Sequence, residues 1–163
     1  MVQICWYLVN IFFFKNAFFV GNKLKIILLK IFGAKIGKGV VIKPCVNIKY
    51  PWKLKIGDYS WIGENVWIDN LDDVSIGNHV CISQGVLLLT GNHNFKSENF
   101  ELMVKPVEVE DGVWLGAKSI VCPGVICGSH SVLTVGSVAT FSLDNYHIYQ
   151  GNPAQKIRQR NIS

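Results

Sequence analysis

A six-residue spacing of aliphatic side chains is the feature that most constrains the fold of this 163-residue chain. A period of six fits neither the apolar stripe of a helix nor the alternation of a flat strand. It predicts short strands that turn a corner every six residues, with three strands to each coil of a solenoid. The thirteen positions that carry the period are Ile36, Ile42, Ile48, Ile56, Ile62, Ile68, Ile76, Ile82, Val109, Leu115, Val121, Cys127 and Leu133.

Small residues complete the repeat. A small or β-branched residue stands four positions after most of these aliphatic residues, where it is expected beside a bend. Two extra pairs, Leu54-Lys55 and Val74-Ser75, shift the period and are expected as bulges at one repeated corner. Glycine directly follows six of the aliphatic residues, and we expect it to supply turns because a positive φ costs glycine little. These six are Gly37, Gly57, Gly63, Gly77, Gly116 and Gly128.

The pattern predicts an all-β solenoid, a prism of three parallel sheets with an aliphatic core, whose two ends need caps. The expected parts are an aromatic, Lys-rich helical cap (1–35), the solenoid (36–141), a loop excursion within it (89–106), and a C-terminal cap with a basic tail (142–163).

A helix is expected inside the N-terminal cap. Asn22 is the expected N-cap and Gly33 the expected stop, because both residue types favour those positions. The expected apolar stripe of this helix consists of Leu24, Ile27, Leu28 and Ile31. The aromatic residues between positions 6 and 19 are expected to plug the first coil, and contact with a bilayer surface is the alternative.

The charge of the chain is divided unevenly. Residues 1–57 hold ten Lys and no Asp or Glu, whereas residues 58–163 hold four Lys, two Arg and eleven acidic residues. A solvated basic face and attraction to an anionic surface both remain open. Lys that alternates with bulky apolar residues is more typical of a membrane interface than of a nucleic-acid groove. Because the basic stretch has no Arg to read bases or phosphates, nucleic acid is not an expected partner.

The cysteine content and the hydropathy of the chain predict the cellular compartment of the protein. The five Cys are odd in number and show no Cys-x-x-Cys spacing, so they are expected to be free thiols in a reducing compartment, with no zinc site. No uninterrupted run of eighteen apolar residues and no cleavable leader is visible. A cytoplasmic location is therefore expected, with peripheral contact at the membrane face as a further possibility.

Several motifs point to one family. They are Phe-Gly-Ala-Lys-Ile-Gly (32–37), Tyr-Pro-Trp (50–52), Trp-Ile-Gly-Glu-Asn-Val-Trp-Ile (61–68), Cys-Ile-Ser-Gln-Gly (81–85), Thr-Gly-Asn-His-Asn-Phe (90–95) and Gly-Asn-Pro-Ala (151–154). With the hexads, they resemble the bacterial hexapeptide-repeat acyltransferases, nearest to the sugar O-acetyltransferases of colanic acid and capsule biosynthesis. The resemblance implies a left-handed parallel β-helix, a homotrimer, acetyl-coenzyme A as cosubstrate, a sugar hydroxyl as acceptor, and no metal.

His93 is the main catalytic candidate. It stands where the hexads stop, at the start of the long excursion, and loops on rigid scaffolds are where sites concentrate. An imidazole with a pKa near ~6.5 can take a proton from a sugar hydroxyl at neutral pH and return it to a leaving thiolate. A solvated loop His is the alternative. The resemblance implies that His93 is the general base and that transfer is direct, without an acyl-enzyme.

The resemblance also implies an acceptor site. Glu101 is expected to hold either His93 or the sugar, with a solvated carboxylate as the alternative. Asp69 and Asn70 are expected to bind the acceptor hydroxyl, and ordinary corner turn chemistry is weighed equally for both.

Cofactor contacts are expected further along the chain. By resemblance, a backbone N–H around Gly116 and Ala117 is the expected oxyanion donor. The pantetheine arm is expected in a groove between subunits, along Trp114, Ala117, Val135 and Thr140. The phosphates need positive charge, for which the sequence offers the basic cluster of Lys156, Arg158 and Arg160. Relatives carry a basic residue directly after Gly-Asn-Pro-Ala, whereas this chain has Gln155 there.

Three other functions are alternatives to a sugar O-acetyltransferase. The first is an N-acyltransferase for a nucleotide amino sugar, which would form an amide in place of an ester. The second is a non-catalytic trimeric scaffold. The third is a γ-class carbonic anhydrase, which is disfavoured because the four His of this chain lack the His-x4-His pair of those enzymes.

Overall fold

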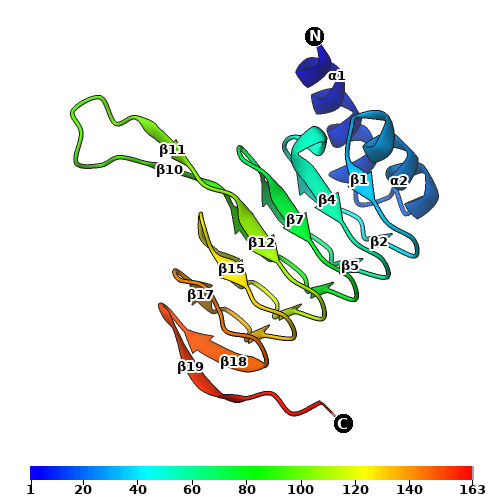
Figure 1. Cartoon of the computed structure of the whole chain (residues 1–163). Coiled ribbons are helices and arrows are strands. Elements are labelled where there is room, and N and C mark those ends of the chain that lie inside the picture. Colours follow the sequence, from blue (N-terminus) through cyan, green and yellow to red (C-terminus); the bar gives the residue numbers. More distant parts are fainter. Residues whose placement is uncertain (163) are drawn as a thin grey trace.

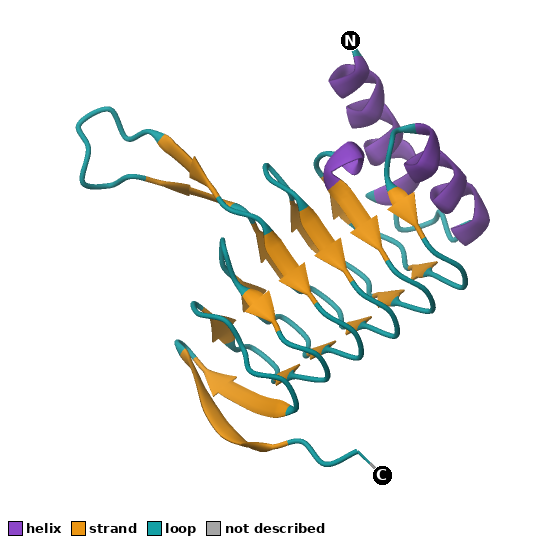
Figure 2. Cartoon of the chain, viewed as in Figure 1, coloured by secondary structure: helices purple, strands orange, loops and turns teal. Residues whose placement is uncertain are grey.

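The computed structural model describes residues 1–162, which form a helical cap, a three-sided solenoid and a projecting β-hairpin (Figure 1). The cap covers the N-terminal end of the solenoid, and the hairpin leaves its side about halfway along (Figure 2). The cap consists of α1 (Val2–Val9), a π-helical turn η1 (Asn10–Phe14) and α2 (Asn22–Ile31).

Three sheets form the walls of the solenoid. The first sheet contains β1 (Lys35–Ile36), β4 (Leu54–Ile56), β7 (Val74–Ile76), β12 (Val107–Val109) and β15 (Ile126–Cys127). The second contains β2 (Val41–Ile42), β5 (Trp61–Ile62), β8 (Cys81–Ile82), β13 (Trp114–Leu115), β16 (Val132–Leu133), β18 (His147–Gly151) and β19 (Ala154–Gln159). The third contains β3 (Asn47–Ile48), β6 (Trp67–Asp69), β9 (Leu87–Leu89), β14 (Ile120–Val121) and β17 (Val138–Ala139).

The core of the solenoid is a ladder of inward side chains, as the hexads predict. All thirteen residues of the six-residue period are buried, and none exposes more than 8% of its surface. Strand pairing aligns equivalent positions of successive coils, for example Ile36 with Ile56 and Ile56 with Ile76. Each such side chain contributes about 1.5–3 kcal/mol by leaving water. The predicted prism of parallel sheets is therefore confirmed.

The glycines that follow the aliphatic residues have a different role from the expected one. None of the six has a positive φ. A Cβ at Gly57 would lie 2.6 Å from the carbonyl carbon of Gly77, and one at Gly116 would lie 2.6 Å from the amide nitrogen of Val135. Glycine is needed at these positions because the backbone of the next coil approaches too closely for a side chain. The positive φ values occur two residues later, at positions such as Tyr59, His79 and His130.

The corner between the third and first sheets, which we call the third corner, accommodates every insertion in the repeat. In the first coil it holds the 3-10 helix η2 (Pro51–Lys53), and in the third coil it gives rise to the hairpin of β10 (Gly91–His93) and β11 (Leu102–Val104). The predicted shifts in the period do occur here. However, Leu54 and Val74 are buried strand residues in β4 and β7, not bulges.

The helical cap differs from the prediction in its packing. The side chain of Asn22 does not cap α2; it accepts from the Ile42 N–H at 2.7 Å and donates to the Val40 carbonyl at 2.9 Å. The buried residues of α2 are Lys25 and Leu29, whereas three members of the expected stripe, Leu24, Ile27 and Ile31, are exposed. Edge backbone groups of the first coil need partners, and the polar ends of Asn22 and Lys25 provide them. Gly33 follows α2 with a φ of 92°, as expected.

The aromatic plug is only partly as expected. Trp6 and Phe14 are buried against the first coil, and the Trp6 ring nitrogen donates to the Ile48 carbonyl at 2.8 Å. Tyr7, Phe12 and Phe18, by contrast, remain exposed.

The solenoid also continues beyond the expected end at position 141. Leu143 bridges to Cys127, and Tyr149 in β18 pairs with Leu133 and is buried. The expected basic tail is largely the antiparallel strand β19, which pairs with β18.

The close approach of neighbouring coils at Gly57 predicts that one added methyl group destabilises the fold. Gly57→Ala should lower the free energy of unfolding by about 2 kcal/mol, because the added Cβ meets fixed backbone atoms of the next coil. Gly136→Asn is the matched control, since Gly136 has a φ of 67° with no atom within 4 Å of an added Cβ, and Asn tolerates that backbone conformation. Urea unfolding of both variants measures the difference. Equal losses of stability would refute the close-approach explanation.

Candidate active site

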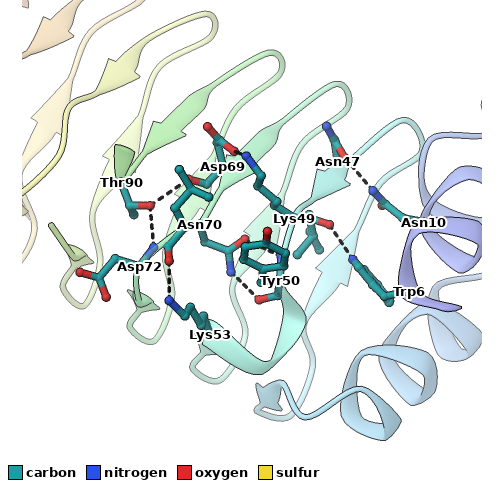
Figure 3. A network of polar contacts seen from close by, with 12 residues as sticks. Trp6, Asn10, Asn47, Lys49, Tyr50, Lys53, Asp69, Asn70, Asp72 and Thr90 are labelled. Atoms are coloured by element: carbon teal, nitrogen blue, oxygen red, sulfur yellow. Dashed lines mark hydrogen bonds and ion pairs between the residues drawn. The ribbon is translucent and has the colours of Figure 1, made fainter. Parts of the chain in front are cut away.

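The hairpin that carries His93 is fixed at its root, which consists of Thr90, Gly91 and Lys105. At the third corner, Thr90 Oγ1 accepts from the Asp72 N–H and donates to the Asp69 carbonyl, both at 2.9 Å (Figure 3). The Lys105 N–H donates to the Thr90 carbonyl at 2.9 Å on the returning side. Gly91 packs so closely on Leu71 that an added Cβ would lie 2.5 Å from it. The two ends of the hairpin are thus fixed to the preceding coil.

The His93 side chain is oriented by the opposite strand of the hairpin. Its Nδ1 lies 2.9 Å from the carbonyl oxygen of Phe100, and the two rings stack at 4.8 Å with an angle of 12°. A carbonyl can only accept a hydrogen bond, so Nδ1 carries the proton of the neutral ring and Nε2 presents a lone pair. The ring is exposed. A neutral imidazole held in this tautomer can accept a proton from a bound hydroxyl.

Glu101 does not hold His93, which corrects one of its two expected roles. The Phe100 carbonyl has that role, and Glu101 instead faces polar groups of its own loop, with the Asn94 amide 3.5 Å from Oε2. Hydrogen bonds from the Ser97 side chain, and then from its own backbone and other loop side chains, lower the pKa of Glu101. Its carboxylate is therefore charged at neutral pH.

Asp69 and Asn70 have different environments. Asn70 is fully buried, and its amide accepts from the Tyr50 N–H at 2.9 Å and donates to the Tyr50 carbonyl at 2.6 Å. It cannot reach a substrate in this structure, so its expected role in acceptor binding is wrong and the corner alternative applies. Asp69 forms a 2.9 Å ion pair with Lys49 and borders a cavity (Figure 3).

That cavity lies between the cap and the outer face of the third sheet. Its volume is about 200 Å³, and its lining consists of Tyr7, Asn10, Lys15, Asn47, Lys49, Trp67 and Asp69. Asn10 donates to Asn47 at 2.7 Å, while its own Oδ1 is buried without a hydrogen-bond partner among residues 1–162. Exposed aromatic faces beside amide, ammonium and carboxylate groups suit a polyhydroxylated ligand. The aromatic and Asn members of this lining were missed in the sequence, because only the packing of the cap on the coils brings them together.

A second cavity lies at the base of the hairpin. It has a volume of about 320 Å³ and is lined by Asn92, Met103, Lys105, Cys122, Pro123 and Thr140. Thr140, an expected cofactor contact, thus lies beside the strand that carries His93. Burial raises the pKa of the Cys122 thiol, so this thiol is protonated and a poor nucleophile at neutral pH.

The other expected cofactor residues lie at a different corner. Trp114 is exposed on the second sheet, and Ala117 and Val135 occupy the corner between the second and third sheets, which we call the second corner. Gly116 is buried, and its N–H already donates to the Leu133 carbonyl at 2.7 Å, so it is not the expected oxyanion donor. No hydrogen bond within residues 1–162 uses the Ala117 N–H, so this group is free to donate to a ligand.

The basic residues near the C-terminus are distinguished by their partners. Lys156 pairs with Asp144, and this contact raises the pKa of Lys156 and lowers that of Asp144. Arg158 is exposed and forms no ion pair within the described chain. Arg160 donates to the carbonyls of Gly112 and His130, at 3.0 and 3.1 Å. Within residues 1–162, Arg158 is the one side chain of this basic cluster that makes no hydrogen bond or ion pair with another residue.

One chain does not assemble all the expected site residues. His93 and Glu101 lie on the hairpin that leaves the third corner, whereas Asp69 ends β6 and Thr140 follows β17 in the third sheet. Ala117 precedes the start of β14, at the opposite end of the same sheet. Within residues 1–162, no three His, Cys, Asp or Glu side chains are arranged as a metal site.

Comparison with known proteins identifies the family. No family model matches the chain. It is 44% identical over 133 residues to WcaF of Escherichia coli, named as a colanic acid biosynthesis acetyltransferase, covering 82% of this chain and 73% of that protein. It is 30% identical to the galactoside O-acetyltransferase of Escherichia coli, covering 82% of this chain and 68% of that protein.

A solved structure confirms the fold. The hexapeptide-repeat acetyltransferase VCA0836 of Vibrio cholerae, in complex with acetyl coenzyme A, superposes with a TM-score of 0.82 at 23% identity, covering 90% of this chain and 81% of that one. The solenoid is thus the left-handed parallel β-helix of such enzymes. Together with the relatives in sequence, this fold shows that the chain belongs to the hexapeptide-repeat acetyltransferases.

Proposed function

We propose that this chain is an acetyl-coenzyme A-dependent O-acetyltransferase that modifies a sugar hydroxyl in surface polysaccharide biosynthesis. The observation that carries the proposal is the His93 imidazole, whose Nδ1 is held by the Phe100 carbonyl and whose Nε2 is free to act as a base. The names of the two Escherichia coli relatives support an O-linked sugar product and a role in an exopolysaccharide pathway.

The proposed mechanism uses the orientation of the His93 ring. His93 Nε2 removes the proton from the acceptor hydroxyl as its oxygen attacks the thioester carbonyl. The N–H of Ala117 donates to the oxyanion that develops on that carbonyl. When the C–S bond breaks, His93 returns the proton to the departing thiolate. The products are an acetyl ester and coenzyme A, and the imidazole is neutral again.

Direct transfer is supported by the protonation state of the thiol at the base of the hairpin. Cys122 lines the cavity at the hairpin base, but burial keeps its pKa above the ordinary value. A covalent acyl-enzyme on this residue would need a thiolate. A reducing, cytoplasmic compartment is part of the proposal, because the number and spacing of the cysteines in the sequence predict free thiols.

The cavity at the cap is the proposed acceptor site. Asp69 borders it at the end of β6, and its neighbour in the ladder, Leu89, directly precedes the root of the hairpin. A sugar there can stack on Trp67 and exchange hydrogen bonds with Asp69 and Lys49. Glu101 is proposed to bind a second part of the acceptor as a charged hydrogen-bond acceptor.

The complete site is proposed to form between subunits of a homotrimer. The hairpin projects away from the body of its own chain (Figure 1), while Trp114 lies on the second sheet and Ala117 and Val135 lie at the second corner. In the proposed ring of three identical chains, the third corner of one protomer packs against the second corner of the next. The pantetheine arm then lies between them, and Arg158 is proposed to contact the phosphates.

The base is tested by substitution. His93→Ala should lower kcat for acetyl transfer by about 10²–10⁴-fold and leave the unfolding transition unchanged, because the ring is exposed. His147→Ala is the control, since its Nδ1 also contacts a backbone carbonyl, that of Asn145 at 2.8 Å, but at the far end of the chain. Full turnover by the His93 variant would refute the assignment. A hydroxylamine-resistant amide product would instead favour the N-acyltransferase alternative.

The shared site is tested by mixing two inactive variants. His93→Ala and Ala117→Trp should each be inactive alone, but co-refolded mixed trimers should regain about one quarter of wild-type activity, because one interface in four pairs the two intact residues. The measurement is turnover against mixing ratio. Absence of recovery, with the trimer mass confirmed by light scattering, would place both residues in one protomer's own site.

Cofactor binding is tested by thermal unfolding. Saturating coenzyme A should raise the Tm, because a ligand that binds only the folded state stabilises it. Arg158→Gln should weaken coenzyme A binding about tenfold, the effect of losing a charge-assisted hydrogen bond. Lys156→Gln should have less effect because Asp144 already pairs with that residue, and Lys55→Gln on the first sheet should have none. No shift in Tm for the unmodified protein would favour the scaffold alternative.

A further inference from the structure

The outer surface of the helical cap is apolar and uncovered. We define the cap face as nine exposed apolar residues of α1, η1, α2 and the segment between η1 and α2. Its members are Ile4, Leu8, Ile11, Phe12, Phe18, Val20, Leu24, Ile27 and Ile31. Phe18 exposes 95% of its surface and Ile31 exposes 71%. Nine apolar side chains exposed on this small helical cap are typical of a docking site.

The two helices turn their outer stripes away from the solenoid. In α2, Leu24, Ile27 and Ile31 follow helical spacing on the side opposite to the buried Lys25 and Leu29. In α1 and η1, Trp6, Asn10 and Phe14 form the buried stripe, and Ile4, Leu8 and Ile11 lie on another side. Contacts between Trp6 and Phe32 and between Phe13 and Phe19, each at 5.2 Å, bind the parts of the cap together. The cap is therefore one body with an apolar outer side.

Positive charge surrounds this apolar surface. Lys15, Lys23 and Lys30 are exposed on the cap, and no acidic residue occurs before Asp58. Lys25 does not contribute to the surface charge, because it is buried and donates to the carbonyls of Ile42 and Lys43. Long Lys side chains can place their ammonium groups among lipid phosphates while their stems cover apolar surface. No helix within residues 1–162 is long and apolar enough to cross a bilayer.

We propose that the cap face docks in the interface of an anionic lipid bilayer, with the solenoid standing away from the membrane. The apolar residues enter the boundary between headgroups and acyl chains, and Lys15, Lys23 and Lys30 lie at the headgroups. Two other occupants of the cap face fit less well. An acidic protein partner would account for the exposed Lys residues, but it would not account for the nine exposed apolar side chains. A second copy of the chain would cover the apolar side chains, but it would bring two positively charged caps together.

The test is sedimentation of the full chain with lipid vesicles. The protein should sediment with vesicles that contain about one third phosphatidylglycerol in phosphatidylcholine, and much less with phosphatidylcholine alone, because the Lys residues are attracted to anionic headgroups. Raising the salt concentration should weaken the binding. No binding to the anionic vesicles at low salt would overturn the proposal.

Variants separate the apolar and the charged contributions. The triple variant Phe12→Gln, Phe18→Gln and Ile27→Gln should bind anionic vesicles at least about tenfold more weakly, because it removes buried apolar area. The control is Ile157→Gln with Ile162→Gln, which makes the same change at exposed positions near the other end of the chain. Lys23→Gln with Lys30→Gln should also lose about tenfold, whereas Lys55→Gln on the first sheet should not.

Two further measurements distinguish membrane docking from a folding defect and from contact between copies of the chain. The coenzyme A-induced shift in Tm should survive in the triple variant, which shows that the fold and the proposed enzymatic function do not depend on the cap face. Light scattering reports the mass of the same variant without lipid. A loss of oligomer mass would show that the cap face joins copies of this chain, and would overturn the proposal. Equal loss of vesicle binding in the variant and its control would overturn it as well.

Discussion

The stacking of equivalent side chains between successive coils is the constraint on which the rest of the structure depends. Each inward residue must pack on its counterparts above and below, so the path of every coil copies that of its neighbour. The backbones approach so closely that glycine is required at the start of several corners. Additional residues therefore enter only where the chain turns outside the core. In this protein they enter at the third corner.

The candidate site is a consequence of that restriction. The ladder of Tyr50, Asn70 and Thr90 satisfies the polar groups of the third corner and fixes the root of the hairpin. The hairpin in turn aligns His93 with Phe100, whose carbonyl selects the tautomer of the imidazole. A rigid solenoid thus orients a catalytic group on a projecting strand pair. That arrangement leaves the group exposed to a neighbouring chain, which is why we propose a site between subunits.

The cap shows how one segment can serve two surfaces. Its inner side closes the first coil with Trp6, Asn22 and Lys25, whose polar atoms meet backbone groups that have no coil beyond them. Its outer side carries the apolar residues proposed to contact lipid. Tyr7 and Lys15 of the cap also border the proposed acceptor cavity. The proposed membrane contact would therefore bring that cavity close to acceptors carried at a bilayer.

The sequence alone determined the architecture and the position of the excursion, because the burial of a six-residue period leaves few other folds, and His93 stands where the period breaks. It did not determine the partners of side chains. Contacts between segments far apart in the chain determine three of these partners. They bury Asn70 against Tyr50, engage the Gly116 N–H with the Leu133 carbonyl, and select which residues of α2 face the solenoid. The apolar stripe that the sequence predicts for α2 is wrong, because the end of a solenoid presents unpaired backbone groups as well as apolar surface. A Lys that binds carbonyls can therefore be buried where Ile was expected. The same dependence on distant contacts explains why only the tertiary structure shows Phe100 as the group that orients the imidazole.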